Sequence, residues 1–217
     1  LPSPLAALGR LADLVRTASF WRTVGSSAAH ILGGFLLSCA LAAALAALAS
    51  RYRAVRELLA PLVGAVKAVP VVSFIILALL WTSPDDLALL ISGLMVFPPV
   101  YLNLLEGIAH TDRSLLELAR VYRVPAARRV RYLYLPAALP YFRAASSLAL
   151  GLCWKAGVAA EVIAVSRGSL GEQLYNAKIY WETADLFAWT AVVVALSALF
   201  EHLFLRGVDA LARRWER

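Results

Sequence analysis

Charged residues, cysteine and histidine are all scarce in this sequence. Only 16% of the 217 residues are charged, whereas an ordinary soluble domain is roughly a quarter charged, which argues against a soluble globular domain. The two cysteines, Cys39 and Cys153, lie in apolar runs without a Cys-x-x-Cys pair, which excludes a disulfide framework or a cysteine-based zinc site. The three histidines, His30, His110 and His202, lack the spacing of metal ligands. The sequence therefore predicts no metal site.

Long apolar runs dominate the sequence instead. Hydrophobic residues make up 61% of the chain and its mean hydropathy is +0.73. Since about 20 apolar residues cross a bilayer as a helix, we predict an all-α, polytopic membrane protein that forms a single transmembrane domain over residues 1–217. Five spans are visible, at 26–49, 58–81, 87–108, 138–165 and 186–205.

Prolines fall inside two of the predicted spans. Pro70 lies in the second span, and Pro98 and Pro99 lie together in the third. Proline has no N–H and its ring clashes with the preceding helical turn. We therefore predict that the third helix is bent or unwound at the adjacent prolines.

A few charged residues also lie inside the predicted spans. Charge within a bilayer is costly and by default marks a pathway or an internal pair. Lys155 and Glu161 are six residues apart, so they do not share a helix face and are not expected to pair. We predict a translocation path lined by Lys67, Trp154, Lys155 and Glu161, with the lysines favouring an anion. The alternative is that these side chains pair structurally or snorkel toward the interface.

The basic residues are distributed unevenly between the two sides of the predicted topology. The 51–57 turn, the 109–136 loop and the C-terminal tail carry 13 of the 21 lysines and arginines, against five on the other side. The positive-inside rule makes the loop and the C-terminus cytoplasmic and residues 1–25 an external, interfacial segment. Because this places Leu1 outside, we expect a sixth span before it. The net charge of +7 then reflects cytoplasmic arginines, and no nucleic-acid partner is expected.

The 109–136 loop contains the basic segment ELARVYRVPAARRVRYLYLP, residues 117–136. Six arginines lie between Arg113 and Arg131 and are interleaved with apolar residues. This pattern predicts a short amphipathic helix, a break at Pro125 and a second helix that leads into the membrane.

The spacing within this segment resembles the EAA loop of ABC-transporter permeases. That loop has Glu-Ala-Ala, three residues, Gly, nine residues and then Ile-x-Leu-Pro. Here Glu117 and Ala119 are followed by Arg123 and then by Leu133-Tyr134-Leu135-Pro136. Leu118 replaces the middle Ala, and Arg123 stands where the family has Gly. Two alternatives stay open: the turn forms without Gly, or the loop has a variant geometry matched to its own ATPase.

Other stretches resemble the nitrate/sulfonate/taurine-type permeases, in family order: KAVP at 67–70, LW at 80–81, FPPVYLN at 97–103, AAE at 159–161 and GSLG at 168–171. The resemblance implies the type I ABC importer fold in a bacterial inner membrane. It also implies a homodimer with two ATPase subunits and an external substrate-binding protein. ATP and Mg²⁺ would bind the ATPase, so this chain is expected to be a non-catalytic permease without a cofactor. It would move a small organic or inorganic solute into the cytoplasm.

The resemblance also implies roles for residues. The loop would form a coupling helix on the ATPase, seated in a groove by Leu115, Leu116, Ala119 and Val121, while Glu117 caps the helix or pairs with a partner arginine. The full coupling set is Leu115, Leu116, Glu117, Ala119, Arg120, Arg123, Leu133, Leu135 and Pro136. A short external helix at about 171–180 is expected to meet the binding protein through Arg167, Glu172 and Lys178. For the 109–136 loop, the alternative to a coupling helix is an ordinary cytoplasmic loop whose arginines bind anionic lipid heads.

Two other function classes fit the sequence less well than an importer subunit does. A secondary, ion-coupled transporter predicts inverted repeats, which this sequence does not show, and it leaves the loop spacing unexplained. A membrane enzyme needs a cluster of His, Asp or Glu, and the sequence scatters these residues. The GSLG stretch at 168–171 lacks the Gly-Lys-Ser/Thr of a phosphate-binding loop.

Overall fold

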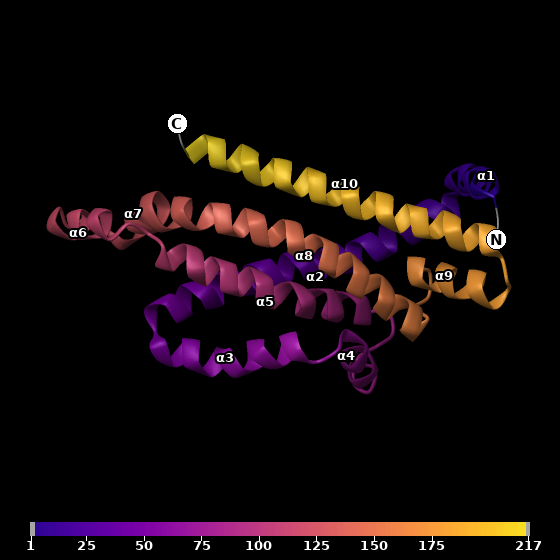
Figure 1. Ribbon diagram of the computed structural model, residues 1–217, viewed down its shortest axis with the longest axis horizontal. Helices are drawn as coiled ribbons and strands as arrows, with labels where there is room; N and C mark the ends of the chain where they lie inside the picture. Colours follow the sequence, from indigo (N-terminus) through magenta and orange to yellow (C-terminus); the bar gives the residue numbers. More distant parts are fainter. Residues whose placement is uncertain (1–2, 216–217) are drawn as a thin grey trace.

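The computed structural model describes residues 3–215, and these residues are helical without a strand (Figure 1). Leu1, the span expected before it and the last two residues of the tail lie outside the described residues. The elements are α1 (Pro4–Val15), α2 (Ala18–Arg51), α3 (Arg53–Ala68), α4 (Val71–Ala78), α5 (Leu87–Ala109), α6 (Arg113–Val121), α7 (Ala126–Arg129), the π-helical turn η1 (Val130–Tyr134), α8 (Leu135–Ala164), α9 (Leu170–Ile179) and α10 (Thr183–Trp215).

Four stretches are long and apolar enough to cross a membrane as single helices. They are α2, α5, the stretch Ala126–Ala164 that ends with α8, and α10. These four confirm the first, third, fourth and fifth predicted spans. The short helix expected at about 171–180 is also present, as α9.

The second predicted span is divided between α3 and α4. The two helices are bent by 103° across a short break, so they count as a fifth span only if the broken pair crosses as one unit. Val69 is extended at the break, with ψ 133°, and Pro70 caps α4. Because a proline disfavours helical geometry in the residue before it, Pro70 ends α3 where the sequence alone suggested a helix running on.

The third span stays helical through its adjacent prolines, so the predicted unwinding is absent, and a bend of this helix stays a prediction. α5 includes Pro98 and Pro99 and runs unbroken to Ala109. It packs between α2 and α8, and Val96, Pro98 and Val100 are all buried there. Neighbouring helices of this kind allow a membrane helix to keep its course through proline.

The core lies between α2, α5 and α8, and small residues bring these helices close together. A Cβ atom added to Gly34 of α2 would lie 2.3 Å from the Leu89 carbonyl oxygen of α5. The Ser38 hydroxyl donates a 2.7 Å hydrogen bond to the Gly93 carbonyl across the same contact. Close backbone approach at small residues is the usual way in which helices pack in membranes.

The molecule has two distinct ends (Figure 1). The arginine-rich end carries α6, α7 and the α2–α3 turn, and the opposite end carries α1, α4 and α9. α3 and α10 flank the core on opposite sides in this view. At the opposite end Arg10 of α1 donates to the Asp185 carboxylate of α10 over 2.6 Å, and this contact raises the pKa of the Arg10 guanidinium. The predicted segment 1–25 thus corresponds to α1 and the start of α2.

Candidate functional site

The predicted amphipathic helix of the 109–136 loop is α6. Its N-cap is Asp112, whose carboxylate accepts a 2.8 Å hydrogen bond from the Ser114 N–H. A side-chain oxygen at this position satisfies one of the free N–H groups of the first turn. Glu117 lies in the middle of the helix and is exposed, so the expectation that it caps α6 is wrong, while pairing with a partner arginine stays a prediction.

The turn after α6 forms without glycine. Arg123 has a left-handed backbone with φ 49°. Its N–H donates to the Arg120 carbonyl over 3.0 Å, and the Val124 N–H donates to the Ala119 carbonyl over 2.8 Å. This pair of bonds is a Schellman motif, whose left-handed position is usually filled by glycine. Of the two alternatives that the sequence left open, the structure has the sharp turn, with Arg123 in the glycine position.

The apolar face of α6 differs from the predicted set. Ala119 is buried at 8% exposure and Leu116 is half-buried, so both face their own chain. The exposed apolar residues form what we call the docking stripe: Leu115 (47% exposed), Leu118 (53%), Val121 (78%) and Tyr122 (73%). Residues three and four apart share a helix face, so the stripe is one continuous surface. Arg120 and Arg123 are exposed beside it.

The predicted break at Pro125 is confirmed, and the chain re-enters the bundle through α7 and η1. Pro125 is the N-cap of α7, and the Leu135 N–H bonds to the Val130 carbonyl five residues back. Leu133 is half-buried in this π turn, and Leu135 and Pro136 are exposed at the start of α8.

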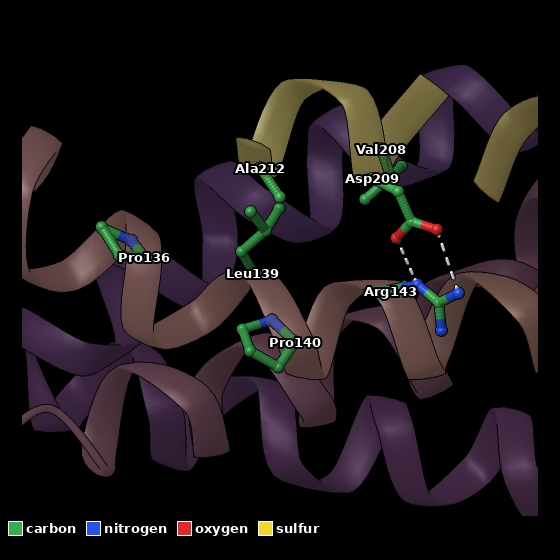
Figure 2. A pocket seen from close by; sticks show the side chains of 7 residues that line it. All are labelled: Pro136, Leu139, Pro140, Arg143, Val208, Asp209 and Ala212. Carbon is green, nitrogen blue, oxygen red and sulfur yellow. Dashed lines mark hydrogen bonds and ion pairs between the residues drawn. The ribbon is translucent and has the colours of Figure 1, made fainter. Parts of the chain in front are cut away.

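The start of α8 lies against the C-terminal part of α10. A pocket of about 200 Å³ lies between the two helices. It is lined by Pro136, Leu139, Pro140, Arg143, Val208, Asp209 and Ala212. The Arg143 guanidinium donates two hydrogen bonds to the Asp209 carboxylate, over 2.5 and 3.1 Å. Figure 2 draws both bonds as dashed lines. Arg143, seven residues after the end of the loop motif, therefore joins α8 to the last helix, a contact that the sequence did not predict.

Glu161 is the centre of a buried cluster at the opposite end. Its side chain is 1% exposed, and a single carboxylate oxygen accepts bonds from the Ser27 hydroxyl (2.9 Å) and the Gly171 N–H (3.0 Å). The Ser27 oxygen in turn accepts a 2.8 Å bond from the Leu170 N–H. We call Ser27, Glu161, Leu170 and Gly171 the Glu161 cluster. It joins α2, α8 and the first turn of α9, and it leaves the carboxylate out of contact with any surface.

The four residues predicted to line a translocation path do not share one surface. Trp154 is 1% exposed and stacks on Phe200 of α10, with ring centroids 5.7 Å apart. Glu161 is buried in its cluster. Lys67 and Lys155 are both exposed, and neither is in an ion pair of the described residues. Lys155 and Glu161 do not pair, as the sequence indicated.

The three residues predicted to contact a binding protein are distributed along α9. Arg167 precedes the helix and Lys178 is in its last turn, and both are exposed. Glu172 is half-buried, and its carboxylate accepts a 2.6 Å bond from the Gly168 N–H. Glu172 therefore stabilises the α8–α9 turn rather than lying free at the surface.

Sequence reasoning missed several of these residues. Leu118 was treated only as a replaced alanine, although its spacing from Leu115 and Tyr122 could have revealed the exposed stripe. No local pattern could have found the contact of Ser27 with Glu161, because 134 residues separate them.

Within residues 3–215 no group of His, Cys, Asp or Glu side chains could hold a metal ion.

Comparison with known proteins gives relatives along the whole chain. A probable ABC transporter permease protein of Brucella abortus is 28% identical over all of this chain and 86% of its own length. A riboflavin transport system permease protein of Chloroflexus aurantiacus is 28% identical, with coverage of 100% and 80%. A taurine transport system permease protein of Escherichia coli is 26% identical, with coverage of 99% and 78%.

The family model described as the binding-protein-dependent transport system inner membrane component matches residues 39–217. The match spans α5, the docking stripe, the Schellman turn and the Glu161 cluster except for Ser27. The helical architecture with four to five membrane helices agrees with it. The chain belongs to this family and is a transmembrane permease subunit of an ABC importer.

Proposed function

We propose that two copies of this chain form the membrane pathway of the importer and that α6 is the element through which an ATPase drives them. The docking stripe is the observation that carries this proposal. Four apolar side chains exposed at the arginine-rich end have no partner within residues 3–215 that covers them. A helix with such a face typically lies in an apolar groove of another protein.

The position of the stripe suits a mechanical role. α6 is joined to α7 by the Schellman turn, and the helix then runs without a break from Ala126 to Ala164. A displacement of α6 would be transmitted through the turn to α8, which packs on α5 and α2 in the core. ATP and Mg²⁺ belong to the ATPase in this proposal, and hydrolysis takes place there.

The two ends of the molecule then face different compartments. The arginine-rich end, with the loop and the C-terminus, faces the cytoplasm, in agreement with the positive-inside rule. The opposite end faces the external binding protein, and Arg167 and Lys178 beside α9 are its proposed contacts. Tyr180 and Trp181, exposed in the turn after α9, add aromatic surface of the kind that interfaces favour.

The relatives do not identify the solute of this chain, because their names include riboflavin, taurine and bicarbonate transport. Those solutes differ in size and charge. The two exposed lysines, Lys67 and Lys155, favour an anionic solute for this chain.

Retention of the ATPase by the solubilised permease tests the proposal. Leu118→Asp places a charge in the centre of the docking stripe, so we expect the retained ATPase to fall at least tenfold, because a charge buried in an apolar groove costs several times RT. Ile179→Asp is the matched control, since Ile179 is 51% exposed at the opposite end. It should leave ATPase retention unchanged.

Equal ATPase retention by the Leu118→Asp variant and the unmodified permease would overturn α6 docking. ATP-independent, gradient-driven uptake into liposomes reconstituted with the permease would favour a secondary transporter instead.

A further inference from the structure

A pocket with one cationic side chain opens between α3, α5 and α8. Its volume is about 460 Å³. Lys67 of α3, Asn103 of α5 and the apolar side chains of Met95, Leu148 and Leu152 line it together with two prolines. We call it the Lys67 pocket. A cavity of a few hundred Å³ with mostly apolar walls and a few polar groups is the usual form of a small-molecule site.

Lys67 has no counter-charge in the pocket. No acidic residue lines the cavity, and the ion pairs among residues 3–215 do not include this lysine. Lys67 lies at the end of α3, before the break that divides the second predicted span. An ammonium group within a membrane span is costly unless it is paired or hydrated. An anion in the pocket would supply the missing partner.

Asn103 supplies a second polar group on the facing wall. Its Nδ2 donates a 2.8 Å hydrogen bond to the Pro99 carbonyl, which fixes the amide. An asparagine amide has two N–H donors and an acceptor oxygen, so one donor and the oxygen are left for a ligand. The remaining walls are apolar, and they fit the carbon body of a solute better than its charge.

A second lysine continues the same surface along α8. Leu148 and Leu152 line the pocket, and Lys155 follows them at helical spacing, so it lies on the same face. Lys155 is exposed and is also outside the ion pairs of the described residues. Trp154 and Glu161, by contrast, are buried elsewhere. Of the four residues predicted to line a path, Lys67 and Lys155 are therefore the two that are exposed.

We infer that the Lys67 pocket is the place in this permease where the transported solute is held in passage, and that it takes a small anion with an apolar body. Lys67 binds the acidic group, Asn103 donates a hydrogen bond to it, and the apolar walls receive the rest. The inference rests on the proposed function. It assigns a residue-level site to the solute, which membership of the family does not.

Reaction of a pocket cysteine with charged thiol reagents tests the inference without knowledge of the natural solute. Leu148→Cys is prepared in a background where the buried Cys39 and Cys153 are replaced by alanine. Membranes that contain the permease with its ATPase are treated with the anionic sulfonatoethyl or the cationic trimethylammonioethyl methanethiosulfonate. The ratio of the two modification rates is the readout.

We expect the anionic reagent to react faster relative to the cationic one when Lys67 is present. Lys67→Met should lower the ratio about tenfold, and Lys67→Arg should preserve it, because only the charge is required. A cysteine at Trp181, 85% exposed at the opposite end, should give a ratio that does not depend on Lys67.

Two results would overturn the inference. One is a Leu148→Cys variant that neither water-soluble reagent modifies, which would mean that the pocket faces lipid. The other is a rate ratio that is unchanged by Lys67→Met. ATPase retention is measured in the same membranes, so a failure of α6 docking is recognised separately from a failure of the pocket.

Discussion

Arg123 holds a left-handed backbone that an L-residue adopts at a cost of roughly 1–2 kcal/mol. Its φ of 49° is required by the Schellman turn, since the Arg123 and Val124 N–H groups reach back to carbonyls of α6. Glycine would form the same turn without the clash of the Cβ atom. The arginine therefore costs stability at this position.

We predict that Arg123→Gly stabilises the permease by about 1 kcal/mol, which corresponds to a rise in Tm of about 2–4 °C for a chain of this size. Thermal unfolding of the detergent-solubilised protein measures the change. Leu118→Gly is the control, because Leu118 lies in the middle of α6 and glycine inside a helix lowers stability. A lower Tm for Arg123→Gly would show that the left-handed turn is absent.

Glu161 offers a second test at the residue scale, because one of its oxygens accepts both hydrogen bonds. A glutamine carbonyl oxygen can take over that role, so Glu161→Gln should change the free energy of unfolding by less than about 1 kcal/mol. Glu161→Leu leaves the Ser27 hydroxyl and the Gly171 N–H without their acceptor and should cost at least about 2 kcal/mol. Chemical denaturation of the two variants gives the comparison. Equal losses would show that the negative charge, rather than the accepting oxygen, holds the cluster together.

At the scale of the element, α8 has one face that tolerates added volume and another that does not. A Cβ on Gly157 would lie 2.4 Å from the Ser92 hydroxyl oxygen and 2.6 Å from Ile31 Cγ1, whereas a Cβ on Gly151 would meet no atom within 4 Å. Gly157→Ala should therefore destabilise by about 1–3 kcal/mol. Gly151→Ala should stabilise by roughly 0.5–1 kcal/mol. Unfolding midpoints of this matched pair measure how closely α8 packs on α2 and α5, and a neutral Gly157→Ala would contradict that packing.

The same helices show what sequence patterns can and cannot predict about an element. Pro125 correctly marked the division between α6 and α7, because this proline is exposed and its local preference determines the backbone there. Pro98 and Pro99 do not unwind α5, because α2 and α8 pack on that helix from both sides. Ala119 was predicted to face an ATPase groove, but it is buried against its own chain. The sequence of a short helix does not show which of its apolar residues pack inward.

At the scale of the whole molecule, the order of the spans and the grouping of basic residues at one end followed from hydropathy and charge. Hydropathy and charge are summed over many residues, so a wrong assignment of one residue does not change the predicted span or orientation. The partners of Glu161 and Arg143 did not follow, because each contact joins residues that are 66 or more apart in the chain. The sequence also did not predict that Trp154 is buried while Lys67 and Lys155 are exposed, because burial depends on how the helices pack.

The orientation of the molecule can be measured directly. Single cysteines at Tyr122 of the docking stripe and at Trp181 of the opposite end occupy exposed positions. We predict that a membrane-impermeant maleimide labels the Trp181→Cys variant in intact spheroplasts and labels the Tyr122→Cys variant only after permeabilisation. The reverse pattern would place the arginine-rich end outside.

The π turn η1 has a consequence for the length of the chain. Its hydrogen bond spans five residues, from Leu135 back to Val130, where an α-helix spans four. Removing one residue from Val130–Tyr134 would convert the turn to α-helix while the flanking helices keep their orientation. Removing a residue from α8 would instead rotate all that follows by about 100°. A one-residue deletion engineered into this turn is therefore expected to leave the buried face of α8 directed at the core, whereas the same deletion inside α8 would turn that face away from it.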